Sequence, residues 1–355
     1  MNNTNDNLAR YHRQIIFSPF GEAGQRRLLA ATAVIVGCGA TGTALSNLLV
    51  RAGVGRVRIV DRDYIELNNL QRQILFDEDD IAANLPKAEA AARKLRRINQ
   101  AVTVEGLVMD VNPGNVLGLL QDADVVLDGT DNFSTRFLLN DACLYLAKPW
   151  VYTGVIAAYG MTATFIPDGA AEKLPGARAT TGCLRCMIEE VPAPGATPTC
   201  DTAGIIGPAA ALLTAVSAAE AIKLLSGGGT LNAGILHMDL WAHDYEQFAL
   251  QRRAGCPACG ARRFEFLNAQ MGTTSAALCG RNAVQVSVVG SRPLDLAALA
   301  EQLTPVAEGV MRNAYLLRAQ IGGYEFTVFP DNRAIIKGTD DEELAKTLYA
   351  RYIGG

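Results

Sequence analysis

The feature that most constrains the fold is a glycine-rich segment between an apolar run and a helical stretch. Ala33–Val36 is a short, uninterrupted apolar run, which is typical of a strand buried on both faces. It leads directly into Gly37, Gly39 and Gly42, and Thr43–Ala52 then has helical character. Glycines spaced in this way allow a tight turn and a close approach of the backbone to phosphate groups at a helix N-terminus. The segment therefore predicts a nucleotide-binding strand–loop–helix unit, but it does not choose between NAD and ATP.

Strands and helices are expected to alternate along residues 31–267, which favours an α/β fold with a doubly wound, mostly parallel, Rossmann-like sheet. The predicted strands are Ala33–Val36, Val57–Val60, Val102–Met109, Val125–Leu127, Trp150–Gly154, Met161–Phe165 and Ile235–Asp239. The predicted helices are Thr43–Ala52, Pro86–Asn99, Val116–Leu120, Thr135–Leu146 and Gly204–Leu225. The last of these is the longest apolar run, but it contains Glu220 and Lys223, so we expect a buried helix and not a membrane span.

Two smaller parts flank this domain. Residues 1–30 are polar and are expected to form a helical arm, while residues 268–355 are expected to form a small α+β domain. Its predicted strands are Ala283–Val289, Ala314–Ala319, Glu325–Phe329 and Ala334–Lys337, and its predicted helices are Asp295–Leu303 and Asp341–Tyr352. The chain ends in Gly354-Gly355, which we interpret as a helix stop. We expect the domain to serve dimer or partner docking.

Composition excludes some classes of protein. Hydrophobic residues make up 49% and charged residues 19% of the chain, which excludes global disorder. The net charge of −4 makes nucleic acid an unlikely partner, since such binding is driven by positive charge. The polar N-terminal segment lacks the apolar core of a secretory signal, so a cytoplasmic, membrane-free protein is expected.

Polar residues gather after the second predicted strand. Asp61 ends that strand, where a carboxylate can accept hydrogen bonds from ribose hydroxyls. A hydride-transfer site has no need for the residues that follow, whereas a triphosphate site does. Arg72 offers a planar fork to phosphate oxygens, and Lys87 adds a second cation. The cluster comprises Asp61, Asp63, Asn68, Asn69, Gln71, Arg72 and Gln73.

A second polar segment follows the strand predicted at Val125–Leu127. It contains Asp131 and Asn132. A carboxylate at a strand tip can hold Mg²⁺, which takes oxygen ligands and substrate phosphates. The alternative for Asp131 is a surface charge, and the alternative for Asn132 is the cap of the following helix.

The cysteines suggest a metal site. Cys183 and Cys186 form one CxxC pair, and Cys256 and Cys259 form another. Four thiolates complete a tetrahedral structural zinc site, which would tie the loop at 168–203 to the end of the domain. A redox CxxC is the rival interpretation, but two pairs are present. Cys200 stands apart, just before the long helix. A helix N-terminus lowers a thiol pKa, although an incidental small residue is an equally good interpretation.

The ordered motifs resemble the MoeB/ThiF/HesA family, the bacterial relatives of ubiquitin-activating enzymes, over Leu8 to about Phe266. The stretches that carry this resemblance are Arg10–Gln14, Gly37–Gly42, Asn68–Gln73, Pro86-Lys87, Asp128–Asn132, the two CxxC pairs and Thr199-Cys200. The resemblance implies adenylation, with ATP and Mg²⁺, of the C-terminal glycine of a small β-grasp sulfur-carrier protein ending in Gly-Gly. Thiamin, molybdopterin or related thiolation pathways would use such a product.

The resemblance also assigns roles to residues. It implies that Asp61 holds the ribose and that Asp131 binds magnesium. Arg13 would reach the site of a second subunit, which implies a homodimer. Asn69, Arg72 and Lys87 would contact the phosphates, and Cys200 would match a cysteine that joins the carrier in some members. Ala40 stands where many relatives carry a further glycine, and it should be tolerated if its φ stays negative.

Other functions remain open at this stage. One alternative is an NAD(P)-dependent oxidoreductase, and another is a binding or regulatory protein on a decayed adenylation domain. A third is a related adenylyltransferase that acts on tRNA or on a peptide. The retained Arg13, Arg72, Lys87 and Asp131 argue against decay.

Overall fold

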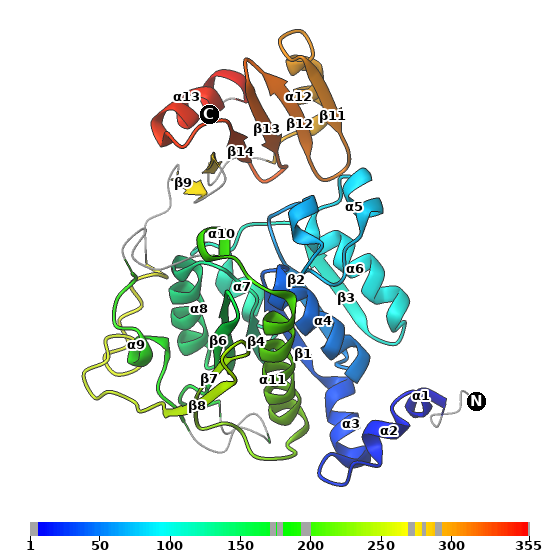
Figure 1. The fold of residues 1–355 in the computed structure, drawn as a ribbon, viewed down its shortest axis with the longest axis vertical. Coiled ribbons are helices and arrows are strands. Elements are labelled where there is room, and N and C mark those ends of the chain that lie inside the picture. The colour runs from blue at the N-terminus through cyan, green and yellow to red at the C-terminus, as the bar shows by residue number, and fades with distance from the viewer. Residues whose placement is uncertain are drawn as a thin grey trace. The chain divides into compact units, whose positions relative to one another are not determined.

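The computed structural model describes residues 6–170, 175, 180–192, 200–268, 274–278, 282–287 and 293–353. The chain divides into two compact units, Met1–Ala269 and Gln270–Gly355. Each unit contains its own sheet (Figure 1).

The sheet of the first unit has eight strands in the order β3-β2-β1-β4-β5-β6-β7-β8. Strands β3 to β5 in this order pair in parallel, and the pairs from β5 to β8 are antiparallel. The expected mostly parallel, doubly wound sheet is confirmed, with an antiparallel extension on one side. The strands are β1 (Thr32–Val36), β2 (Arg56–Val60), β3 (Thr103–Leu107), β4 (Val125–Asp128), β5 (Trp150–Ile156), β6 (Tyr159–Phe165), β7 (Gly234–Asp239) and β8 (Asp244–Ala249).

Helices cover both faces of this sheet (Figure 1). In β1, Ala33 and Ile35 belong to the core beneath α3, α4, α6 and α11, whereas Val34 and Val36 belong to the core beneath α7 and α8. The strand is therefore buried on both faces, as its apolar run predicts. The helices are α1 (Asp6–Ala9), α2 (His12–Ile15), α3 (Gly21–Ala30), α4 (Ala40–Ala52), η1 (Leu67–Asn69), α5 (Glu78–Ala82), α6 (Lys87–Ile98), α7 (Val116–Leu120), α8 (Phe133–Leu146), α9 (Leu184–Met187), α10 (Cys200–Ala203) and α11 (Gly207–Ser226).

Helix α11 is long and apolar enough to cross a membrane by length and composition. It packs instead against α3, α4 and the strands β5 and β6, and 61% of its apolar window is buried inside the protein. Buried polar groups fix it in place, since Ser217 bonds to Thr153 and Thr162 of the sheet. The prediction of a buried helix is confirmed.

The second unit is a six-stranded antiparallel sheet in the order β11-β12-β13-β14-β10-β9, together with two helices. Its apolar core lies between the sheet and the helices and includes Leu299, Phe326 and Leu348. Its elements are β9 (Thr274–Leu278), β10 (Ala283–Ser287), α12 (Leu296–Leu303), β11 (Gly309–Arg312), β12 (Leu317–Ile321), β13 (Tyr324–Val328), β14 (Arg333–Lys337) and α13 (Glu342–Tyr352). Gly354 and Gly355 lie outside the described residues.

The strand predicted at Ala314–Ala319 is wrong at its start. Its first residues form the turn between β11 and β12, where the Asn313 side chain accepts hydrogen bonds from the backbone N–H groups of Tyr315 and Leu316. An asparagine that bonds to the backbone two residues ahead favours a turn over a strand. Strands β8, β9 and β11 were not predicted, because their residues lack a continuous apolar run or a clear alternation.

The turn between β1 and α4 depends on glycine for two different reasons. Gly37 has φ +92°, a conformation that L side chains rarely adopt, and a Cβ there would lie 2.4 Å from the Gly129 carbonyl oxygen. A Cβ on Gly42 would lie 2.0 Å from the carbonyl oxygen of Gly37. The predicted tight turn therefore requires glycine because of close backbone contacts as well as because of the positive φ of Gly37.

We predict that Gly42→Ala lowers the free energy of unfolding by about 1–3 kcal/mol, because the new methyl group has no room. Gly118→Ala is the matched control, since a Cβ on Gly118, also within a helix, meets no atom within 4 Å. It should leave stability unchanged or raise it slightly. Urea denaturation of both variants measures the difference, and equal stability would show that the β1–α4 contact is loose.

Candidate functional site

The candidate site lies at the carboxyl ends of β1, β2 and β4. The sheet order places β1 between β2 and β4, and the chain connections run outward from this point in both directions. Ligands of doubly wound folds bind in the crevice at such a switch point. Three of the segments singled out in the sequence meet here, namely Gly37–Gly42 after β1, Asp61–Gln73 after β2 and Asp128–Asn132 at the end of β4.

Backbone contacts join the glycine loop after β1 to the ends of both neighbouring strands, β2 and β4. The N–H of Gly37 donates to the Val60 carbonyl at 2.8 Å, and the N–H of Gly129 donates to the Val36 carbonyl at 2.7 Å. A Cβ on Gly129 would lie 2.3 Å from the Gly37 carbonyl oxygen. Gly129 therefore has to be glycine for the same steric reason as Gly37, although only Gly37 has a positive φ. This requirement could not be predicted from the sequence, because the contact joins residues far apart in the chain.

The N-terminus of α4 faces the crevice without a side-chain cap. Gly39 is the N-cap residue and Ala40 is the first residue of the helix, with the negative φ that its position requires. The backbone N–H groups of a first helical turn have no partner within the helix and attract anions. The expectation that Ala40 is tolerated is confirmed, and the helix end provides a place for phosphate oxygens.

Asp61 holds the glycine loop in place. Its carboxylate accepts hydrogen bonds from the backbone N–H of Cys38 at 2.5 Å and from that of Asp63 at 2.6 Å. Burial raises the pKa of Asp61, and the nearby Lys87 opposes that rise. Asp61 is thus fixed at the end of β2 beside the loop, which is where a ribose-binding carboxylate has to be.

Lys87 is buried beside the same carboxylates. It is 4% exposed, its Nζ lies 3.3 Å from an Asp63 carboxylate oxygen, and its backbone N–H donates to the Asp63 carbonyl. Arg62 adds a second positive group, which forms an ion pair with Asp110 at 3.1 Å. The structure therefore brings Asp61, Asp63 and Lys87 together at the end of β2, as the sequence cluster predicts.

The next polar residues form a short 3₁₀ turn. Asn69 is 2% exposed, its side-chain oxygen accepts from the Glu66 N–H, and its amide group donates to Asn68 at 2.8 Å. Arg72 donates to the Asn68 carbonyl at 2.7 Å. Gln71 is exposed, and its side chain reaches the Ile205 carbonyl at 3.3 Å. Asn69 thus braces the turn that presents Arg72.

Asp131 and Asn132 have different environments. Asp131 is exposed, whereas the Asn132 side chain accepts a hydrogen bond from the Thr135 N–H at 2.9 Å as the cap of α8. The helix-cap alternative for Asn132 is confirmed. The Asn132 amide group also donates to an Asp131 carboxylate oxygen at 3.5 Å.

A buried ion pair beneath this loop was missed by the sequence analysis. Arg136 of α8 pairs with Asp128 at 2.9 Å and also donates to the Thr130 carbonyl at 2.7 Å. Burial raises the pKa of Asp128, and Arg136 opposes that effect. The pair clamps the loop that carries Asp131. The one available signal was an arginine beside the apolar residues Phe137, Leu138 and Leu139 of the predicted helix.

Arg13 lies away from the glycine loop of its own chain. It is exposed on α2, next to Tyr11, whose hydroxyl accepts a hydrogen bond from Asn99 at 2.9 Å. The Tyr11 ring also packs against Gly53, the residue that ends α4. Gly39 is at the other end of this helix of 13 residues, about 20 Å away along its axis. The structure does not bring Arg13 together with the other predicted site residues.

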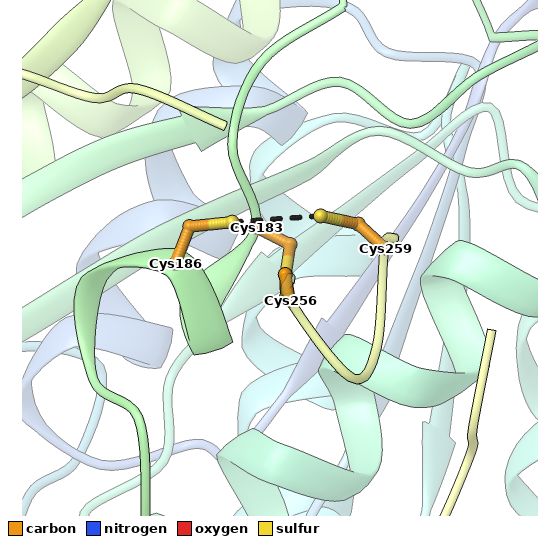
Figure 2. Close-up of side chains that lie close together, drawn as sticks. All are labelled: Cys183, Cys186, Cys256 and Cys259. Atoms are coloured by element: carbon orange, nitrogen blue, oxygen red, sulfur yellow. Dashed lines mark hydrogen bonds between the residues drawn. The ribbon is translucent and has the colours of Figure 1, made fainter. Parts of the chain in front are cut away.

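The four paired cysteines meet at one point (Figure 2). Cys183 Sγ lies 3.7 Å from Cys256 Sγ, and Cys186 Sγ lies 3.5 Å from Cys259 Sγ. All four sulfur atoms lie within 4.8 Å of one another. A tetrahedral ion with metal–sulfur bonds of about 2.3 Å separates its ligands by about 3.8 Å, so the four thiols fit zinc.

Within the cluster, the surroundings of Cys259 favour the thiolate form. A hydrogen bond from Cys183 lowers the pKa of the Cys259 thiol to about 5, and the same interaction raises the pKa of Cys183. Cys200 begins α10, and its side chain lies outside the described part of the structure. Four residues further on, the Gly204 carbonyl accepts a hydrogen bond from the Ala157 N–H.

Comparison with known proteins agrees with this geometry. Residues 11–258 match the ThiF family. The chain is 42% identical over 347 residues to the sulfur carrier protein ThiS adenylyltransferase of Bacillus subtilis, covering 97% of this chain and 99% of that protein. It is 39% identical to a sulfur carrier protein adenylyltransferase of Thermus thermophilus, covering 72% of this chain and 92% of that protein.

Solved structures support the fold. The Escherichia coli protein MccB, solved with ATP, has a TM-score of 0.61 and 23% identity, covering 72% of this chain and 75% of that chain. Its complex with MccA-N7isoASN also has a TM-score of 0.61. At this identity the likeness concerns the fold. The sequence match to the Bacillus protein along nearly the whole chain decides against the oxidoreductase alternative. The protein belongs to the ThiF family of adenylyltransferases.

Proposed function

We propose that this protein adenylates the C-terminal carboxylate of a small sulfur-carrier protein at the expense of ATP. The observation that carries the proposal is the 42% identity, over 97% of this chain, to an enzyme named for that reaction on ThiS. The crevice at the ends of β1, β2 and β4 supports it, because it combines a phosphate-binding helix end with carboxylates and cations.

The chemistry follows from charge. The carrier carboxylate is already ionised, so it needs no general base. One of its oxygens attacks the α-phosphate of ATP, the bond to the β-phosphate breaks, and pyrophosphate leaves with the electron pair. Arg72, Lys87 and the α4 N-terminus would stabilise the negative charge on the phosphates, while Asp61 would hold the ribose.

Magnesium would be held by Asp131. Its side chain is exposed at the tip of β4, while the neighbouring Asp128 is already paired with Arg136 and is fully buried. The donor set therefore fits a cation with one protein carboxylate and several waters, which is usual for Mg²⁺ bound to nucleotides. The ion would neutralise charge on the phosphates.

We predict that Asp131→Ala reduces carrier-dependent ATP–pyrophosphate exchange by at least about 100-fold, the loss typical of removing one group that stabilises transition-state charge. Asp239→Ala, on the β7 hairpin, is the control and should leave exchange intact. Circular dichroism checks that both variants fold. Wild-type exchange in the Asp131 variant would remove its role. No exchange by the wild-type protein with any Gly-Gly-ending β-grasp carrier would contradict the proposed function.

The position of Arg13 supports a homodimer with shared sites. Arg13 is exposed, and the length of helix α4, about 20 Å, separates it from the glycine loop of its own chain. It could therefore serve catalysis only in another subunit. Ile16 and Phe17 on the same arm are also exposed, at 58% and 62%, and would be covered by a second copy.

We predict that Arg13→Ala and Arg72→Ala are each inactive alone and that their mixture recovers activity. In a hybrid dimer, one of the two sites contains both arginines. Random exchange of subunits makes about half of all dimers hybrids, so about a quarter of all sites become intact. The exchange assay after co-incubation measures this recovery. No recovery, although mass spectrometry shows hybrid dimers, would contradict shared sites.

We also propose that Cys183, Cys186, Cys256 and Cys259 hold one structural zinc ion. Their four sulfur atoms fit a tetrahedral ion, and all coordination positions would be filled by protein. The ion would tie the short helix α9 to the segment that follows β8.

We predict one zinc per chain, with its loss in Cys259→Ser accompanied by a lower melting temperature, because metal-binding free energy contributes to folding. Cys143→Ala is the control. It removes a buried thiol that is not part of the cluster and should retain zinc. Elemental analysis of protein purified without chelator decides the matter, and zinc-free wild-type protein would contradict the proposal.

The role of Cys200 and the docking role of the second unit stay predictions. The mapping of Cys200 onto a carrier-binding cysteine rests on the family resemblance of Thr199-Cys200. The match to the Bacillus protein extends over nearly the whole chain, so the second unit is shared with a relative that acts on ThiS.

A further inference from the structure

Gln73 is a buried residue at the candidate site that the sequence places in the polar cluster after β2 but to which it gives no role of its own. It closes the 3₁₀ turn that follows β2, where its backbone N–H donates to the Asn69 carbonyl at 2.9 Å. Its own carbonyl accepts from the Phe76 N–H at 3.1 Å. The backbone is therefore fixed at both sides, and the side chain is only 3% exposed.

The carboxamide of Gln73 lies against the glycine loop. A Cβ built on Gly39 would have the Gln73 amide nitrogen as its nearest neighbour, at 3.9 Å, with the Gly129 carbonyl oxygen at 4.0 Å. The amide is thus within reach of the N-terminus of α4. This is the part of the loop where the backbone leaves space, in contrast to Gly37 and Gly42.

One end of this carboxamide lacks a partner. Among the described residues, no donor reaches the buried Gln73 side-chain oxygen. Burying an unsatisfied polar atom is unfavourable for folding, so such atoms in a native protein need an explanation. A ligand bound in the crevice provides one.

We propose that the Gln73 carboxamide is a contact to the magnesium-bound triphosphate of ATP, an inference that rests on the proposed function. Phosphate oxygens only accept hydrogen bonds, so the amide nitrogen donates to one of them. The amide oxygen accepts from a water molecule held by the phosphates and Mg²⁺, since such water is a good donor. Gln73 then contacts the same part of ATP as the α4 N-terminus does, namely the phosphates, and it contacts neither the adenine nor the ribose.

Isothermal titration calorimetry with ATP and Mg²⁺ tests this. Gln73→Leu removes both polar ends, and we expect it to weaken ATP binding by about 10-fold to 100-fold, the range for a hydrogen bond to a charged group. Gln73→Glu keeps the shape, removes the donor and adds negative charge, so it should weaken ATP binding further. Adenosine, which has no phosphate, should bind both variants as it binds the wild type.

A matched control comes from the second unit. Gln285 is also buried, at 5% exposure, and its side-chain oxygen also lacks a partner among the described residues. Gln285→Leu makes the same chemical change outside the crevice and should leave ATP affinity unchanged.

The outcomes separate the two claims. If the wild-type protein binds no ATP, the proposed function fails. If it binds ATP and both folded Gln73 variants bind within twofold of it, the proposed contact alone is wrong. A parallel loss of adenosine and ATP affinity would also overturn it, because Gln73 would then act on the shape of the whole site.

Discussion

The site depends on a backbone contact between two loops that are far apart in the chain. Gly37 and Gly129 approach so closely that a Cβ on either would lie within 2.5 Å of the other's carbonyl oxygen. This contact sets the ends of β1 and β4 side by side and thereby fixes the spacing between the α4 N-terminus and the loop of Asp131. A side chain at either position would move the two halves of the site apart.

Charges at this edge of the sheet fall into two groups. The buried ones are paired within the protein, as Asp128 with Arg136 and Lys87 with Asp63. These pairs position the loops, since an unpaired buried charge is costly. The residues that face outward, among them Asp131, are the ones left to meet a ligand. The uncharged Gln73 carboxamide, which we propose to contact the ligand, is buried as well.

Local patterns predicted much of this structure from the sequence. The glycine spacing indicated the β1–α4 turn, and two CxxC pairs indicated the cysteine cluster, because each depends on residues close together in the chain. Gly129 and Arg136 could not be found in this way, since their importance comes from contacts made only in the folded protein. Gln73 belonged to the predicted polar cluster, but its burial against the glycine loop could not be predicted. Arg13 was assigned to the site of a second subunit by the family resemblance, whereas its separation from the glycine loop of its own chain follows from the packing of Tyr11 on Gly53. The strand β8 escaped prediction because it is exposed on both faces and lacks an apolar pattern.

The placement of ATP in the crevice at the ends of β1, β2 and β4 can be tested by hydrogen–deuterium exchange with and without ATP and Mg²⁺. This measurement locates the bound nucleotide on the wild-type protein. We expect bound ATP to slow the exchange of backbone amides in residues 37–43, 61–73 and 128–132, the three segments at the carboxyl edge of the sheet. Protection absent from these segments, or confined to the β7–β8 hairpin at 234–249, would contradict the placement of the nucleotide in this crevice.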